Sequence, residues 1–241
     1  MSASTFRGDL FAGRTVLVVG GTSGIGAGIA DAFVSLGASV SVTGATQEEC
    51  ASSRHRAIAA DVRDDAAMSH VIGDLAELHV LVNCAGIIRR VAEHDLATFE
   101  TVLAINLTGT MRACTLARPK LAATGGSIVN TASILSFFGG GLVPGYSASK
   151  GGIAQLTKSL AIAYAKEGIR VNAVAPGWVD TPLTKALRED PARNDAILAR
   201  TPLGRWAVPD DIAGAVVFLC SPAARFITGA VVPVDGVYLV A

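Results

Sequence analysis

The amino-acid sequence predicts an α/β fold in which helices cover both faces of one parallel sheet. Three observations predict this fold class. Short apolar runs rich in β-branched residues alternate with helical patterns along the whole chain, the first run ends in a glycine-rich turn that opens a helix, and 241 residues suit one domain with a sizeable core. We therefore expect a single doubly wound (Rossmann) domain over residues 1–241, with seven strands in the order 3-2-1-4-5-6-7.

The predicted elements follow from composition and periodicity. Strands are expected at residues 15–19, 39–43, 56–60, 80–83, 127–130, 170–175 and 231–234, and long helices at 105–123 and 146–168. Residues 46–55 offer only about two helical turns, so the crossover between the second and third strands is abbreviated. Four prolines interrupt the pattern near residues 180–208, which we interpret as a flap over the ligand crevice.

The first strand runs directly into a turn that contains Gly20, Gly24 and Gly26. Gly20 lets the chain turn, Gly24 leaves room for a pyrophosphate beside the backbone, and Gly26 lets the helix pack closely on the sheet. The amides of the first helical turn then face the anion. This pattern predicts a dinucleotide site at the carboxyl end of the first strand.

A second group of residues points to proton transfer. Tyr146 and Lys150 are four residues apart and share a helix face, so the ammonium is expected to lower the phenol pKa from its usual value near 10. Ser133 follows a predicted strand, and Asn106 lies in an apolar helix, where an unpartnered buried amide would be costly. Beside a bound nicotinamide, Tyr146, Lys150 and Ser133 could relay a proton, which indicates an oxidoreductase, and a polar role is the better explanation of Asn106, the fourth candidate catalytic residue.

The glycine turn, Asn83-Cys-Ala-Gly86, the four candidate residues and Pro176-Gly177 occur in an order that makes the chain resemble the short-chain dehydrogenase/reductase family over nearly its whole length. The resemblance implies that Tyr146 is the general acid/base and that Ser133 holds the substrate oxygen. It implies that Lys150 binds the nicotinamide ribose and that Asn106 kinks a helix to hold a water. The cofactor-binding residues that it implies are Gly20, Thr22, Ser23, Gly24, Ile25, Gly26, Gly44, Ala45, Asp61, Val62, Asn83, Ala85, Gly86, Tyr146, Lys150, Pro176, Gly177, Val179 and Thr181.

The end of the second strand bears on the choice of nicotinamide. Residues 42–47 contain neither an acidic residue for a ribose 2′-hydroxyl nor an arginine for a 2′-phosphate. A missing carboxylate loses one hydrogen bond, about 1 kcal/mol, whereas a phosphate without a cation loses considerably more. NAD is therefore weakly favoured, and NADP stays open because Arg54, Arg56 or Arg63 could fold inward.

Three segments resemble the sugar-acid branch of the family, which includes 2-deoxy-gluconate, 2-keto-3-deoxy-gluconate and gluconate dehydrogenases. They are residues 83–90, 133–139 and 205–206. This likeness implies a secondary alcohol or its ketone in a sugar acid or polyol. Arg89 or Arg90 could pair with a substrate carboxylate, unless both are surface residues. A 3-oxoacyl thioester reductase is the alternative enzyme, and a nicotinamide-binding scaffold or sensor is the non-enzymatic alternative.

Composition excludes several other classes. The formal net charge is zero without a basic block, which argues against nucleic acid, and the apolar runs are too short for a membrane span. The four cysteines lack metal-ligand spacing, so we expect free thiols and no metal. The polar start at residues 1–7 argues against a signal peptide and favours the cytoplasm. The apolar end at residues 231–241 and the long helices favour a homotetramer.

Overall fold

The computed structural model describes residues 5–241. Its seven strands form one sheet in the order β3-β2-β1-β4-β5-β6-β7, with neighbouring strands parallel, so the predicted fold and strand order are confirmed. The strands are β1 (Thr15–Val19), β2 (Ser39–Gly44), β3 (Arg56–Ala59), β4 (Val80–Asn83), β5 (Ser127–Thr131), β6 (Arg170–Pro176) and β7 (Val231–Val234).

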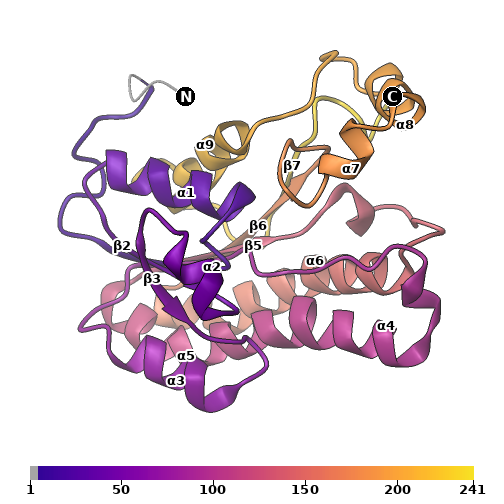
Figure 1. Cartoon of the computed structure of the whole chain (residues 1–241). Coiled ribbons are helices and arrows are strands. Elements are labelled where there is room, and N and C mark those ends of the chain that lie inside the picture. Colours follow the sequence, from indigo (N-terminus) through magenta and orange to yellow (C-terminus); the bar gives the residue numbers. More distant parts are fainter. Residues whose placement is uncertain (1–4) are drawn as a thin grey trace.

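Helices cover both faces of the sheet (Figure 1). One face carries α1 (Gly24–Ser35) and α9 (Pro209–Cys220), and the other carries α3 (Asp65–Gly73), α5 (Gly109–Thr124) and α6 (Pro144–Tyr164). The shorter helices are α2 (Gln47–Ala51), α4 (Leu96–Leu103), α7 (Lys185–Arg188) and α8 (Pro191–Ala199). Single turns are η2 (Ala92–His94), η4 (Ile134–Ser136), η5 (Ala165–Glu167) and η6 (Pro222–Ala224), and η3 (Ala104–Thr108) is a π-helical turn.

The helices differ in detail from those that the periodicity predicts. The helix expected at 105–123 is α5, but the chain is helical from Leu96 onward and widens into the π turn before Gly109. The helix expected at 146–168 begins two residues earlier, because Pro144 fits the first helical position, and it ends in the single turn η5. The five-residue α2 confirms that the second crossover is short.

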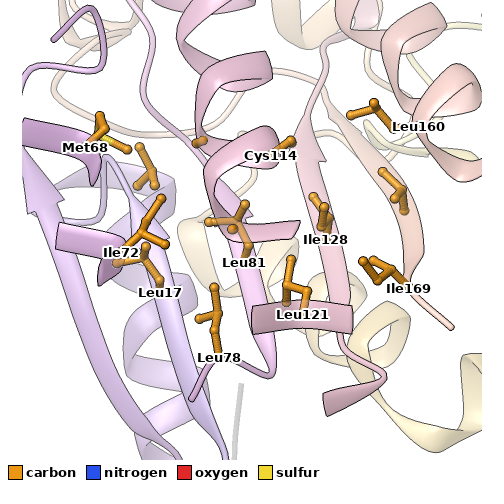
Figure 2. Packing of buried hydrophobic residues seen from close by; sticks show 14 of the residues in the cluster. Leu17, Met68, Ile72, Leu78, Leu81, Cys114, Leu121, Ile128, Leu160 and Ile169 are labelled. Carbon is orange, nitrogen blue, oxygen red and sulfur yellow. The ribbon is translucent and has the colours of Figure 1, made fainter. Parts of the chain in front are cut away.

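An apolar cluster packs the sheet against α3, α5 and α6 (Figure 2). Leu17 of β1, Leu81 of β4 and Ile128 of β5 are fully buried and meet side chains such as Met68 of α3 and Leu121 of α5. A second cluster on the opposite face joins the other side of the strands to α1 and α9. These two layers fix the strands, and through them the loops at the strand ends.

Parallel pairing brings the carboxyl ends of the central strands to one edge. Val19 of β1 pairs with Asn83 of β4, which pairs with Asn130 of β5, and Thr131 pairs with Val174 of β6. The segments that follow these strands therefore converge, and they hold most of the predicted site residues. In Figure 1, α7, α8 and the C-terminus lie close together beyond this edge.

Between residues 5 and 241, no helix is long and apolar enough to cross a membrane. The polar start that argues against a signal peptide falls in part on residues 1–4, which lie outside the described residues.

Candidate active site

Tyr146, Lys150 and Ser133 come together at the carboxyl edge of the sheet. Tyr146 and Lys150 lie on the first turns of α6, with the Lys150 ammonium 5.5 Å from the centre of the phenol ring. The Ser133 hydroxyl, which follows β5, lies close enough to the Tyr146 phenol to lower its pKa. Lys150 is 4% exposed, and its Nζ donates a hydrogen bond of 2.6 Å to the carbonyl of Thr131. The structure therefore assembles three of the four candidate catalytic residues.

The direction of the Tyr146 pKa shift differs from the one that the sequence suggests. Burial raises the pKa of Tyr146, the hydrogen bond from Ser133 lowers it, and the negative charge of Glu93 raises it further. The sequence suggested that Lys150 lowers this pKa, but desolvation of the phenol itself dominates and the pKa is raised. Burial lowers the pKa of Lys150 from 10.5 to about 8.

Local hydrogen bonds fix Ser133 relative to α6. Ser133 is the N-cap of η4, and its Oγ accepts a hydrogen bond from the amide of Leu135. The Ser136 hydroxyl accepts from the amide of Ser133 and donates to the carbonyl of Lys150 at 2.6 Å. One serine therefore ties the Ser133 turn directly to the helix that carries Tyr146 and Lys150.

Asn106 lies in the π turn η3 and is buried. Its Oδ1 accepts from the amide of Ile87, and its Nδ2 donates to the carbonyl of Ile87 and to the hydroxyl of Ser149. The side chain thus locks the segment after β4 to α6. Its amide group is fully engaged by the protein, and a π turn of this kind distorts the helix as the family resemblance implies.

The glycine turn is built to receive an anion. Gly20 has φ +77°, and a Cβ there would lie 2.4 Å from the amide nitrogen of Ala85, so β1 and β4 approach closely at this edge. A Cβ on Gly26 would lie 2.2 Å from the carbonyl oxygen of Gly20. Ser23 is the N-cap of α1, but its side chain makes no capping bond, which leaves amides of the first turn for a ligand. These features fit a dinucleotide phosphate.

The end of β2 holds an acidic group that the sequence did not reveal. The carboxylate of Glu49, on α2, accepts a hydrogen bond of 2.7 Å from the amide of Ala45. A Cβ on Gly44 would lie 3.1 Å from that carboxylate and 2.9 Å from the methyl group of Thr22. A glutamate five residues beyond the strand thus occupies the position where an acidic strand-end residue is usual.

Asp61 and Val62 follow β3, as expected, but their side chains are already engaged. Arg63 donates from its amide and its guanidinium to the carboxylate of Asp61, and this pairing lowers the pKa of Asp61. Val62 is buried and packs against Gly109, where a Cβ would lie 2.6 Å from a Val62 methyl group.

β4 ends at Asn83, and residues 84–86 form the segment that follows it. The side chain of Asn83 points into the core, where its Nδ2 donates to Asn130 Oδ1 at 2.9 Å, so only its backbone remains for a cofactor. Cys84 stands where the family has a second asparagine, and its sulfur accepts from Thr131. A Cβ on Gly86 would lie 3.3 Å from Asn106 Oδ1 and 3.8 Å from Lys150 Nζ. Gly86 thus borders the candidate catalytic residues, with Ala85 beside the glycine turn.

The segment after β6 reaches the glycine turn from the other side. Gly177 packs against Asp235, and Val179 is buried. The side chain of Thr181 lies 3.5 Å from the position of a Cβ on Gly24. A cavity of about 490 Å³ opens here, and its lining includes Thr22, Ser23, Gly24, Arg54, Asp180 and Thr181.

The two candidate substrate arginines lie in different environments. Arg89 is exposed, and its guanidinium donates to the carbonyl of Ile88. Arg90 is half-buried. Burial and the nearby charge of Arg193 on α8 lower its pKa, and the charge of Glu93 acts in the opposite direction. Among residues 5–241, no carboxylate lies within ion-pairing distance of Arg90.

Comparison with known proteins identifies the family. Residues 19–238 match the family described as Enoyl-(Acyl carrier protein) reductase, which spans almost the whole chain. A 2-dehydro-3-deoxy-D-gluconate 5-dehydrogenase of Bacillus subtilis is 40% identical, over 94% of this chain and 95% of that protein. The chain belongs to the short-chain dehydrogenase/reductase family. It is a nicotinamide-dependent oxidoreductase that acts on CH–OH groups.

Two further relatives of this short-chain dehydrogenase/reductase extend the comparison. A galactitol 2-dehydrogenase (L-tagatose-forming) of Cereibacter sphaeroides is 40% identical, over 98% of both chains. A crystal structure of a protein from Agrobacterium tumefaciens, described as a 2-deoxy-d-gluconate 3-dehydrogenase with bound NADP, superimposes with a TM-score of 0.89. It is 40% identical and covers 98% of this chain and all of that one.

Proposed function

We propose that this enzyme interconverts a secondary hydroxyl group and a ketone in a sugar acid or polyol, with the acid/base chemistry at Tyr146. The contact between Tyr146 and Ser133, with the buried Lys150 beside them, is the observation that carries this proposal. Relatives named for a sugar acid and for galactitol supply the substrate class.

The proposed proton transfer takes place at the Tyr146 hydroxyl. In oxidation Tyr146 Oη removes the proton of the substrate hydroxyl, and in reduction it returns a proton to the carbonyl oxygen. The Ser133 hydroxyl donates a hydrogen bond to the same substrate oxygen and holds it in place. The two-electron step is the chemistry that the nicotinamide supplies when bound.

Lys150 and Asn106 support this step in different ways. Lys150 Nζ is buried beside Gly86 and the Tyr146 ring, so its remaining N–H groups can hold the nicotinamide ribose next to the phenol. Asn106 ties the segment after β4 to α6 through Ile87 and Ser149, and we assign it the role of shaping the proton path through the π turn.

The proposed cofactor site runs from β3 to the flap. The uncapped amides of α1 hold the pyrophosphate, and the close approaches at Gly20 and Gly26 leave no room for side chains there. Asn83 contributes only its backbone, because its side chain is bonded to Asn130. The other contributors stay as the sequence predicts: Thr22, Ser23, Gly24, Ile25, Gly44, Ala45, Asp61, Val62, Ala85, Gly86, Tyr146, Lys150, Pro176, Gly177, Val179 and Thr181.

We propose NADP as the preferred nicotinamide. The preference for NAD that the sequence suggested is not supported, because the similar Agrobacterium structure holds NADP. Arg54, which lines the cavity beside the glycine turn and pairs with Asp31, is the guanidinium we assign to the 2′-phosphate. The negative charge of the Glu49 carboxylate disfavours a 2′-phosphate at the end of β2. Arg54→Gln should lower the NADP/NAD ratio of kcat/KM at least about tenfold, and Glu49→Gln should raise it. An unchanged ratio in Arg54→Gln would contradict this assignment.

Arg90 is the arginine we assign to a substrate carboxylate. It is half-buried and forms no ion pair among the described residues, with only the nearby charge of Glu93 acting on it, whereas Arg89 is exposed. Arg90→Ala should lower kcat/KM about 30- to 150-fold for acidic substrates but only slightly for neutral polyols. Arg89→Ala is the matched control, and it should leave the acid/neutral ratio near that of the wild type. Equal acid/neutral ratios in the wild type, Arg89→Ala and Arg90→Ala would show that neither arginine pairs with a substrate carboxylate.

A substrate panel tests the proposed class. Gluconate-type acids, their keto forms, polyols and acetoacetyl thioester should each be measured with NAD(H) and NADP(H) by nicotinamide absorbance. We expect the sugar acids or polyols to give the highest kcat/KM. A clear preference for the thioester would instead establish the alternative, a 3-oxoacyl thioester reductase.

The oligomeric state, the domain organisation and the cellular location of the enzyme stay predictions from the sequence. We propose a homotetramer of single-domain chains, each with a flap at 180–208 that closes over the substrate. A light-scattering mass near that of one 24.6 kDa chain at micromolar concentration would refute the tetramer. The cytoplasmic location rests on the sequence alone.

A further inference from the structure

Glu93 is a buried carboxylate that none of the proposed catalytic steps uses. It lies in η2 and is 1% exposed. One carboxylate oxygen accepts a hydrogen bond of 2.7 Å from the amide of Arg89, and the other accepts one of 2.7 Å from the amide of Tyr146. Within residues 5–241, no basic side chain pairs with it. Backbone amides at Arg89 and Tyr146 hold its charge, and the half-buried Arg90 lies near enough for the two charges to interact.

The contact with Tyr146 caps α6 from another part of the chain. Val143, the N-cap of α6, has no side-chain capping bond, and Pro144 has no amide proton. The Tyr146 amide is one of the donors that a helix start leaves without a partner, and a carboxylate there is favoured by the helix dipole. Gly145 permits the close approach, since a Cβ on it would lie 3.3 Å from the Glu93 carboxylate.

Other bonds hold the same two segments together. The Val91 amide donates to the carbonyl of Leu142 at 2.7 Å, and a ring nitrogen of His94 lies 2.9 Å from the carbonyl of Gly141. Val91 has φ +67°, a conformation that is unfavourable for a β-branched residue and persists only where its surroundings impose it. The turn at 89–94 is thus held in one conformation against the start of α6.

We propose that Glu93 is a positioning residue that couples the arginine turn at residues 89–90 to the acid/base Tyr146. A single rigid carboxylate fixes the main chain at Arg89 and at Tyr146, so the substrate-binding side and the proton-transferring side keep one mutual geometry. This proposal rests on the function proposed above, in which Tyr146 exchanges the proton. Glu93 touches neither substrate nor cofactor and acts only through Arg89 and Tyr146.

The charge of Glu93 gives this role a signature beyond stability. Among the described residues, the charged groups that face Tyr146 are Lys150 from its own helix and Glu93 from η2, and Cys84 at the end of β4 faces Lys150. Negative charge at Glu93 raises the pKa of Tyr146. Oxidation needs the deprotonated phenol, so kcat/KM rises with pH through the Tyr146 pKa. Removal of the charge should therefore move this rise to lower pH.

Two variants separate the charge from the geometry. Glu93→Gln keeps the length but loses the charge, and its amide nitrogen cannot accept the second hydrogen bond. Glu93→Asp keeps the charge but is too short to reach both amides. We expect kcat to fall about 10- to 100-fold in both variants, since small misplacements of reacting groups cost this much. The pH rise should move down only in Glu93→Gln. Glu100→Gln, at an exposed position on α4, is the control and should match the wild type.

Cofactor affinity and thermal stability complete the test. The Kd for NADP, measured by fluorescence titration, should stay within about twofold of the wild-type value in both variants, because the hydrogen bonds of the Glu93 carboxylate go to the amides of Arg89 and Tyr146 and not to the glycine turn. Wild-type kcat and an unshifted pH profile below the melting temperature, even with a lowered Tm, would overturn the positioning role. If Glu93→Gln does not fold, the kcat of Glu93→Asp tests the proposal, and a wild-type kcat in that variant would overturn it. Full turnover in Tyr146→Phe would instead overturn the proposed function, so the two failures are distinguishable.

Discussion

Lys150 links burial at the active site to the pH dependence of stability. The side chain is 4% exposed, and burial lowers its pKa from 10.5 to about 8. An unfolded chain keeps the lysine proton until about pH 10.5, whereas the folded protein releases it near pH 8. Between these values the unfolded state binds more protons, so the contribution of Lys150 to the free energy of unfolding rises with pH. The drop in pKa corresponds to an increase of about 3 kcal/mol in the free energy of unfolding. This increase is fully present above pH 10.5 and absent below pH 8.

Urea unfolding of the cofactor-free enzyme measures this contribution. The free energy of unfolding should be determined for the wild type and for Lys150→Met at pH 7.5 and pH 10. Groups that titrate in both proteins, such as the buried cysteines, cancel in the difference. We expect the wild type to gain about 2 kcal/mol relative to Lys150→Met between the two pH values. Lys158 is an exposed lysine on the same helix, and Lys158→Met is the control. The wild type should gain no stability relative to this variant between the two pH values. A difference constant within about 0.5 kcal/mol would refute the burial of a charged lysine at this position.

Two further predictions concern the cofactor turn and the core. Gly26→Ala should abolish NADP binding in a titration, because its Cβ would lie 2.2 Å from a backbone carbonyl, whereas Gly73→Ala meets nothing within 4 Å and should bind normally. Normal binding by Gly26→Ala would contradict the close helix–strand packing. Leu81→Ala removes a fully buried side chain and should cost about 2 to 5 kcal/mol in urea unfolding. Leu96→Ala, at a 68% exposed position, should cost less than about 1 kcal/mol, and equal losses would contradict the assigned core.

The strands and the glycine turn could be predicted because their signals are local. β-Branched runs mark the strands, and the glycines mark the close approaches that the structure places at Gly20 and Gly26. The family resemblance implied a kinked helix at Asn106, but the residue pattern alone did not predict the π turn at 104–108, because it goes with an Asn106 side chain bonded to Ile87 and Ser149, which lie far away in the sequence. The periodicity of apolar residues does not record such contacts.

Charges at the site were harder to predict, because burial and partners depend on the fold. The spacing of Tyr146 and Lys150 predicted their proximity but not the direction of the Tyr146 pKa shift, which desolvation dominates. Glu49 and Glu93 lie in polar stretches that are typical of surface residues, yet each carboxylate accepts backbone amides at the site. Only these hydrogen bonds, which form in the folded chain, distinguish the two residues from solvated glutamates.

The most direct test of the proposed mechanism is the turnover of Tyr146→Phe on the best substrate of the panel. This change removes only the hydroxyl that exchanges the proton. The mechanism predicts that kcat falls about 10²- to 10⁴-fold, while the Kd for NADP stays close to the wild-type value. Turnover at the wild-type rate would contradict the assignment of Tyr146 as the acid/base.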